Sequence, residues 1–185
     1  MNTTSHTMQR RLVPVQRTCP ARLVPTGTPI QIPAGTFVTL TQALGNAYTV
    51  IVNGNMARID GADADALGFE QQRKRYQANS DGSVNMDDVW DALRSVYDPE
   101  IPVNVVDLGL IYDCQLQRSE VGNAIAVTMT LTAPGCGMGP VLVDDIKQHV
   151  AQVPNVDAVT VDLVFDPPWS RDMMTEEAQL ELGLF

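Results

Sequence analysis

Residues 122–165 contain the pattern that decides the fold of the C-terminal half: GNAIAVTMTLTAPGCGMGPVLVDDIKQHVAQVPNVDAVTVDLVF. The first part alternates, as a strand with one buried face does, through Ile125, Val127, Met129 and Leu131. After a glycine-rich break, apolar residues recur at helical spacing at Leu142, Ile146, Val150 and Val153. Alternation then returns in Val159, Val161, Leu163 and Phe165. A strand, a helix and a strand in this order predict parallel strands joined by a right-handed crossover.

The residues before this stretch add a helix and a further strand. An apolar stripe over 86–97 predicts an amphipathic helix that starts after Asn85 and stops at Pro99. Alternation over 108–116 predicts a strand that forms an antiparallel hairpin with the first strand of the crossover. The expected fold class is therefore α+β, a two-layer α-β-β-α-β domain with a three-stranded mixed sheet and a short C-terminal helix at about 175–182.

The N-terminal part predicts a separate small all-β domain. Its apolar runs are short and are divided by turn residues, and Asn53-Gly54 fits a tight hairpin turn. The residues that follow are polar and lack apolar periodicity, which is typical of a linker. The predicted parts are a disordered tail at 1–11, a β-rich domain at 12–69, a linker at 70–84 and the α+β domain at 85–185.

Composition excludes several classes of protein. The net charge of the 185 residues is −10, and it is uneven: residues 86–185 carry four Lys and Arg against seventeen Asp and Glu. Such an acidic half repels phosphate, so we expect no nucleic-acid partner. No apolar run approaches the roughly 18 residues that cross a bilayer, so we expect no membrane segment. Three cysteines at wide spacing favour the reducing cytoplasm over a disulfide scaffold.

Several polar residues fall at one edge of the predicted sheet. The carboxyl ends of two parallel strands share an edge, and the strand paired antiparallel with one of them begins there. Open α/β arrangements bind ligands at such an edge, close to a helix N-terminus. The residues expected there are Asp98, Glu100, Asp107, Thr132, Cys136 and the segment 166–169.

Cys136 is the most chemically suggestive of these residues. Gly135 and Gly137 flank it and allow a ligand to approach the backbone closely. The helix that starts shortly after it favours the thiolate, which serves as a metal ligand or a nucleophile. The structural alternative is a small buried residue in a tight turn. Because Pro140 replaces the third glycine of GxGxxG and no GK[ST] occurs, dinucleotide and P-loop sites are excluded.

The residues at this edge suggest two kinds of chemistry, metal binding and nucleophilic catalysis by a cysteine. Carboxylates such as Asp98 and Asp107 can hold a divalent metal together with a thiolate, or each can simply cap a turn. A nucleophilic cysteine usually needs a histidine, but His149 lies near the far end of the second helix, about 20 Å from Cys136 at 1.5 Å per residue. Cys114, on an apolar strand face, and Cys19, in the β-rich part, are expected to be packing residues.

The motifs at this edge resemble those of a known family. In chain order they are Asp98-Pro99-Glu100-Ile101-Pro102, Val105-Val106-Asp107-Leu108-Gly109-Leu110, Met129-Thr130-Leu131-Thr132-Ala133-Pro134-Gly135-Cys136-Gly137-Met138 and Pro167-Pro168-Trp169. They look like the metal-sulfur cluster biosynthetic domain family, which includes SufT, PaaD and the eukaryotic cytosolic iron-sulfur targeting factors. The resemblance covers about residues 85–183, and the β-rich segment in front resembles the SufT members.

The resemblance implies an auxiliary, non-enzymatic role in iron-sulfur protein maturation. It places the family's cysteine on Cys136 and its acidic and threonine positions on Asp98, Asp107 and Thr132. The implied cargo is a transient iron-sulfur cluster or iron, held at Cys136 and Asp107, with Gly135 and Gly137 beside it. The implied partners are iron-sulfur assembly proteins and apoprotein clients.

Three modes of action are compatible with these residues. Cys136 could contact a cluster, iron or persulfide; it could serve a thiol-dependent redox enzyme with Thr132 as hydrogen-bond donor; or the β-rich domain could make the chain a pure adaptor. A cluster normally needs four ligands, mostly thiolates, so one cysteine must be completed by a homodimer, a partner or a small thiol.

Overall fold

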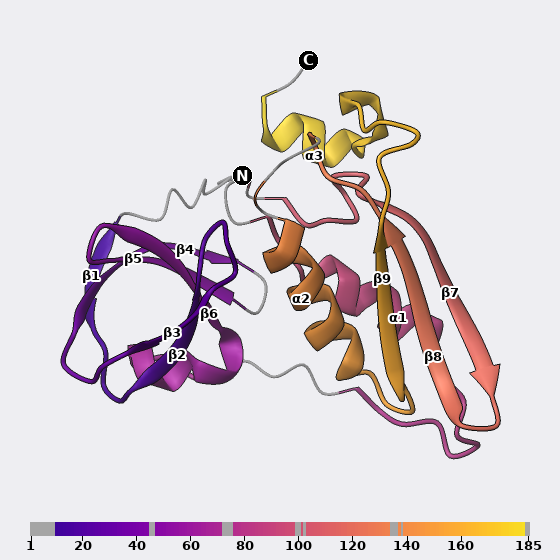
Figure 1. Ribbon diagram of the computed structural model, residues 1–185, viewed down its shortest axis with the longest axis horizontal. Helices are drawn as coiled ribbons and strands as arrows, with labels where there is room; N and C mark the ends of the chain where they lie inside the picture. Colours follow the sequence, from indigo (N-terminus) through magenta and orange to yellow (C-terminus); the bar gives the residue numbers. More distant parts are fainter. Residues whose placement is uncertain are drawn as a thin grey trace, which may run out of the picture. The chain divides into compact units, whose positions relative to one another are not determined.

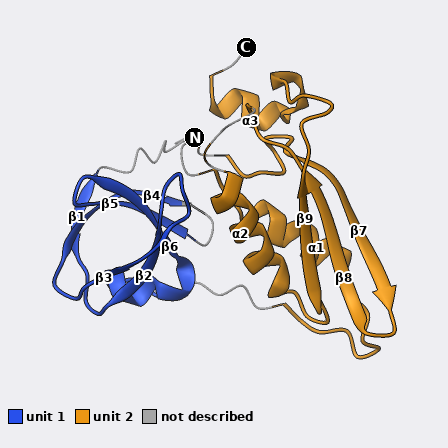
Figure 2. Ribbon diagram, viewed as in Figure 1, with its two compact units in different colours: residues 1–73 blue, residues 74–185 orange. Residues whose placement is uncertain are grey.

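The computed structural model describes residues 10–44, 47–71, 76–98, 101, 103–133, 137 and 139–183. The chain divides into two compact units, Met1–Arg73 and Lys74–Phe185 (Figure 2). None of the helices within the described ranges is long and apolar enough to cross a membrane. The finer boundaries of the tail, the β-rich domain and the linker stay predictions.

The second unit has the predicted α-β-β-α-β order followed by a short helix (Figure 1). Its elements are α1 (Met86–Arg94), β7 (Ile111–Ser119), β8 (Gly122–Met129), α2 (Gly139–Ala151), β9 (Ala158–Leu163), η2 (Arg171–Met173) and α3 (Glu176–Glu181). The strands form a mixed sheet in the order β7-β8-β9, antiparallel between β7 and β8 and parallel between β8 and β9. The predicted fold class is confirmed.

Strand register explains where the core of this unit lies. Val127 on β8 stands opposite Cys114 on β7 and Val161 on β9, so one face of the sheet carries apolar side chains across all three strands. Helices α1 and α2 cover that face (Figure 1) and contribute their own buried residues, Val89, Leu93, Leu142, Ile146 and Val150. Each apolar side chain that is fully buried in this way stabilises the fold by about 1.5–3 kcal/mol.

The predicted element ends differ from the structure at two places. Helix α1 ends at Arg94 instead of Tyr97, because the carbonyl of Val96 accepts a hydrogen bond from Val105 and the chain has become extended. The first strand begins at Ile111 instead of Leu108, because residues 105–109 form a turn. The alternation of buried residues continued through that turn and concealed it.

The first unit is an antiparallel sheet that curls around its own core (Figure 1). Its elements are β1 (Arg11–Pro14), β2 (Cys19–Leu23), β3 (Pro29–Ile32), β4 (Phe37–Leu44), β5 (Ala47–Val52), β6 (Asn55–Asp60) and η1 (Gly61–Leu67). The strand order is β1-β4-β5-β6-β2-β3. The predicted hairpin at Asn53-Gly54 joins β5 to β6, and both turn residues have positive φ, 49° and 80°. The small all-β expectation is confirmed.

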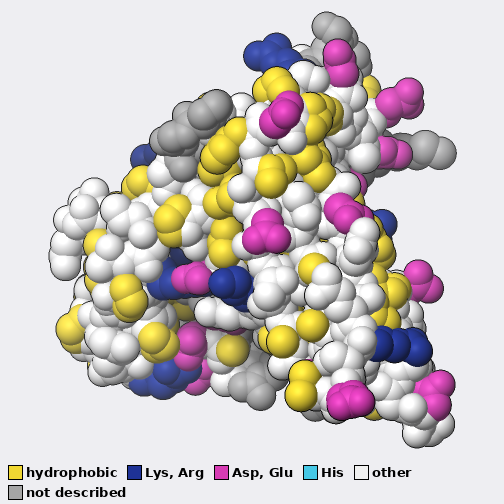
Figure 3. Space-filling view, turned by 45° about the vertical axis from the view of Figure 1, so that its right-hand side comes forward, with side chains coloured by type: hydrophobic (Ala, Val, Ile, Leu, Met, Phe, Trp, Pro, Cys, Tyr) yellow, Lys and Arg dark blue, Asp and Glu magenta, His cyan; other side chains and the backbone are white. Residues whose placement is uncertain are grey.

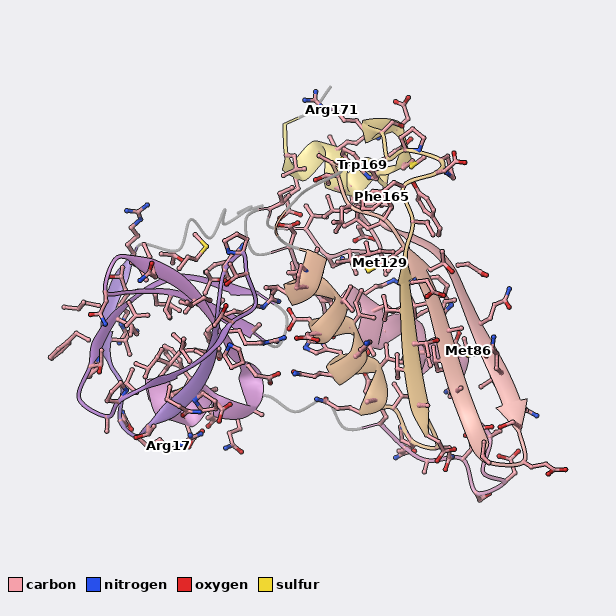
Figure 4. The ribbon with its side chains drawn as sticks, in the orientation of Figure 1. Arg17, Met86, Met129, Phe165, Trp169 and Arg171 are labelled. Carbon is pink, nitrogen blue, oxygen red and sulfur yellow. The ribbon has the colours of Figure 1, made fainter. Side chains whose placement is uncertain are left out.

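Arg17, which Figure 4 labels on the first unit, fixes the short helix η1 to the connection between β1 and β2. Its guanidinium donates to both carboxylate oxygens of Asp65, at 2.8 and 2.7 Å, and to Asp63 at 2.9 Å. These hydrogen bonds, followed by one from Gln71, hold the pKa of Asp65 well below its usual range. An acid with a lowered pKa stabilises the folded state above its unfolded pKa, and this contribution is lost as the pH falls through the folded value.

We predict that the Asp65 carboxyl in the wild-type chain titrates far below about 3.9, the value for an unperturbed aspartate. In Arg17→Gln the midpoint should move upward, because the charged hydrogen-bond donor has been removed. Carbon-detected NMR of the Asp65 carboxyl against pH measures both values. A wild-type midpoint near that of the variant would show that Arg17 does not hold this carboxylate in solution.

Candidate functional site

The predicted site residues fall into two groups. Glu100, Gly135 and Cys136 lie outside the described residues. Asp98, Asp107, Thr132 and Gly137 are described: the first two lie between α1 and β7, and the other two lie between β8 and α2.

Asp107 is held in a turn by a neighbouring asparagine. The side-chain oxygen of Asn104 accepts hydrogen bonds from the backbone N–H groups of Val106 and Asp107, both at 3.0 Å. The amide nitrogen of the same side chain donates to the Asp107 carboxylate at 2.8 Å. One buried asparagine therefore closes the turn and orients the carboxylate that follows it.

The C-terminal segment is fastened to this turn. The indole N–H of Trp169 donates to the carbonyl of Leu108 at 2.7 Å, and the backbone N–H of Thr175 donates to the carbonyl of Asp107 at 2.9 Å. Gly109 has a φ of +77°, and a Cβ there would collide with the backbone of Met173. The glycine thus serves both the turn and the close approach of the segment over it. Trp169 therefore anchors the C-terminal segment to this turn.

Asp98 lies at the entrance to the same turn region. It is buried, with 6% of its surface exposed, and its carboxylate accepts a hydrogen bond from the backbone N–H of Ile101 at 3.3 Å. Its own N–H donates to the carbonyl of Val103 at 3.4 Å. The adjacent residue, Tyr97, bridges to Asn104, so Asp98 and Asp107 belong to one compact connection between α1 and β7.

The ends of β8 and β9 and the start of α2 lie at one edge of the sheet. Val164 donates to the carbonyl of Met129 at 2.8 Å, which extends the pairing of β8 and β9 to the edge where both strands end. Helix α2 starts between these strand ends: a Cβ on Gly139 would lie 3.2 Å from Leu131 and 3.6 Å from Leu163. Half-buried Thr132 follows β8 at this edge, and Cys136 lies outside the described residues, so its predicted place there stays a prediction.

Thr130 is a polar residue at this edge that the sequence did not single out for a role. It is completely buried, and its N–H donates to the carbonyl of Leu110 at 2.8 Å, joining β8 to the turn of Asp107. Its hydroxyl has no hydrogen-bond partner among the described residues. An unpaired hydroxyl in a buried position is costly, by about 1–3 kcal/mol.

The two described cysteines are poor candidates for thiol chemistry. Burial, with Asp63 as the next cause, raises the pKa of Cys19 to about 11. Burial, followed by Asp113, raises the pKa of Cys114 to about 11 as well. Both thiols are therefore protonated near neutral pH, and only thiolates are effective nucleophiles and metal ligands. The prediction that both are packing residues agrees with this geometry.

No cluster of three or more His, Cys, Asp or Glu side chains able to hold a metal ion occurs in the described part of the chain. This finding does not test the predicted metal site of Asp107 and Cys136, because Cys136 lies outside the described residues. Asp107 is held by Asn104 in the described geometry. An asparagine three residues before an aspartate is a recognisable turn signal, and it could have identified Asn104 from the sequence.

Replacement of Gly109 by alanine tests the fastening of the C-terminal segment. Gly82 is a matched control in the same unit, because its φ is also +77° but nothing lies within 4 Å of a Cβ built there. We expect Gly82→Ala to cost about 1–2 kcal/mol in unfolding free energy, from the backbone conformation alone. Gly109→Ala should cost about 1–3 kcal/mol more, from the added clash.

Urea unfolding measures both costs, and hydrogen exchange of the Trp169 indole N–H reports whether the segment has moved. Faster exchange of this N–H in Gly109→Ala than in Gly82→Ala is the expected result. Equal losses of stability and equal exchange in the two variants would contradict a close contact between Gly109 and Met173.

Comparisons with known proteins find relatives of this chain. The family model described as "Iron-sulfur cluster assembly protein" matches residues 86–163. A protein named "Fe-S protein maturation auxiliary factor" from Porphyromonas gingivalis is 50% identical over 97 residues, 52% of this chain and 90% of that protein. In the solved structures, "Domain of Unknown Function DUF59" from Bacillus anthracis is 37% identical, with a TM-score of 0.48, over 54% of this chain and 92% of that one.

A further relative limits how far the likeness extends. The "Fe-S protein maturation auxiliary factor SufT" from Staphylococcus aureus is 39% identical over 89 residues, 48% of this chain and 98% of that protein. The matched residues make up nearly the whole of that relative, so it has no counterpart of the first unit. It therefore does not share the β-rich segment that we expected in SufT members. Since the chain covers 90% of the Porphyromonas gingivalis protein at 50% identity, it belongs to the iron-sulfur cluster assembly protein family.

Proposed function

We propose that the chain is an auxiliary factor in the maturation of iron-sulfur proteins and that the Cys136 thiol contacts the cargo transiently. Membership of the family, and the names of relatives from Porphyromonas gingivalis and Staphylococcus aureus, support the first part. The single observation that carries the second is the placement of the other thiols: Cys19 is buried and Cys114 half-buried, which raises the pKa of both. Cys136 remains as the cysteine for this chemistry.

The neighbourhood of Cys136 supports this assignment. Adjacent Cα atoms are about 3.8 Å apart, and the next residue, Gly137, is exposed. Thr132, four residues before Cys136, is half-buried, and Gly139, three residues after it, is the buried first residue of α2. The orphan N–H groups at a helix start favour negative charge, so the Cys136 thiolate would be stabilised by this end of α2.

The cargo of this site is an iron-sulfur cluster, iron or persulfide sulfur. A cluster normally has four protein ligands, mostly thiolates, and the described residues contain no group of three acidic, His or Cys side chains that could serve. We therefore propose that Cys136 is one ligand of a shared site, completed by a second copy of the chain, by an assembly protein or apoprotein client, or by a small thiol. In this role the chain delivers cargo, catalyses no reaction of its own, and acts in the reducing cytoplasm, where its thiols stay free.

Removal of the Cys136 thiol tests this proposal. In cells that lack the chain's own gene, iron-sulfur enzymes should regain activity when the wild-type chain is supplied. Cys136→Ser should fail to restore it, because the ligand atom has been lost, and Cys114→Ser should restore it, because that thiol is half-buried on an apolar strand face and has a raised pKa. The measurement is enzyme activity relative to enzyme protein under iron limitation.

Circular dichroism melting of each purified variant verifies that both have folded. Full restoration by a folded Cys136→Ser chain would overturn the proposed role of this thiol. It would shift the function toward an adaptor that acts without contact to the cargo.

A further inference from the structure

Exposed apolar side chains concentrate on the C-terminal segment. Seven large apolar side chains are exposed among the described residues, and four of them lie within residues 163–180. These four, called here the C-terminal apolar group, are Leu163 (38% exposed), Phe165 (45%), Met173 (36%) and Leu180 (57%). Scattered exposed apolar residues are normal on a soluble protein, but a concentration of them marks an interaction surface.

The backbone that carries this group is firmly attached to the second unit. The hydroxyl of Tyr112 donates to the carbonyl of Pro167 at 2.7 Å and lies 3.6 Å from the sulfur of Met173. Tyr112 therefore holds the start of the segment, at Pro167, close to Met173 in η2. The side chain of Gln179 donates to the carbonyl of Met174 at 3.1 Å and holds α3 against η2. Figure 4 shows Phe165 and Trp169 in this upper part of the unit. The exposure is therefore a property of the folded segment.

Acidic side chains surround the group. Residues 159–183 contain six Asp and Glu and a single cation, Arg171. Exposed Asp162, Asp166 and Asp172 are each next in sequence to a member of the group. Figure 3 shows hydrophobic side chains gathered over this part of the molecule with Asp and Glu side chains among them. A complementary surface must present apolar side chains together with positive charge.

One member of the group, Leu163, lies at the start of α2. The side chain of Leu163 lies 3.6 Å from the position of a Cβ on Gly139, the first residue of α2. Residue 139 is three positions after Cys136 in the sequence, so Leu163 lies close to the residue at which the segment with Cys136 joins α2. Nucleic acid and anionic lipid headgroups do not fit, because the acidic side chains repel phosphate.

We propose that the C-terminal apolar group and its acidic neighbours dock a protein segment that presents apolar side chains flanked by Lys or Arg. This inference rests on the proposed function, since it names the kind of surface by which a client or an assembly protein would be recognised. The apolar contact supplies affinity, and the opposite charges speed encounter and align the partner.

Binding of two designed peptides to the full-length chain tests the proposal. One peptide alternates Leu with Lys, the other alternates Leu with Glu, and the fluorescence anisotropy of each is measured at low and at high salt. The wild-type chain should bind the Lys peptide, more weakly at high salt, and should not bind the Glu peptide. Phe165→Ser, and the double variant Asp162→Lys with Asp172→Lys, should each weaken binding of the Lys peptide about tenfold.

The matched control is the turn between β7 and β8, where exposed Glu120 stands beside Val121, which is 93% exposed. The double variant Glu120→Lys with Val121→Ser also reverses an acidic charge and removes an exposed apolar side chain, but at the far end of the hairpin. It should bind the Lys peptide as the wild type does. Equal weakening by the control pair, or no weakening by the Phe165 and Asp162/Asp172 variants, would overturn the proposal. Cys136→Ser should bind normally, so failure of docking and failure of the thiol's proposed role give different results.

Discussion

Parallel pairing of β8 with β9 is the constraint on which the arrangement of the second unit depends. Parallel neighbours cannot be joined by a tight turn, so the chain must return across the sheet through α2. That crossover puts the end of β8, the start of α2 and the end of β9 at one edge. The loop with Cys136, the C-terminal segment after Leu163 and the turn of Asp107 are all connected to this edge, although they are distant in sequence.

The sequence predicted what depends on periodicity and on local turn chemistry. The crossover, the hairpin at Asn53-Gly54 and the helix start after Asn85 follow from residue patterns that are decided within a few positions. The end of α1 and the start of β7 could not be predicted in this way, because a buried turn and a strand carry the same apolar residues. Only the hydrogen-bond partners of Val96 and Leu110 distinguish the two.

The candidate site was predictable in part for the same reason. Topology predicts which residues meet at the edge, and Asp107 and Trp169 are indeed joined through the turn that follows Asn104. The role of Gly109 could not be predicted, since it depends on contact with Met173, which is 64 positions away. The raised pKa values of Cys19 and Cys114 depend on burial within the completed fold, and they agree with the expectation from the sequence that both are packing residues.

The account's central claim is that Cys136 contacts iron-sulfur cargo, and anaerobic reconstitution tests it most directly. Wild type and Cys136→Ser are incubated with ferrous iron and sulfide, and the absorption spectrum, the iron content and the native mass are compared. The account predicts a chromophore and bound iron that depend on Cys136, on an assembly in which a second copy or an added thiol completes the ligand set. Equal spectra and equal iron content in the two folded proteins would contradict it.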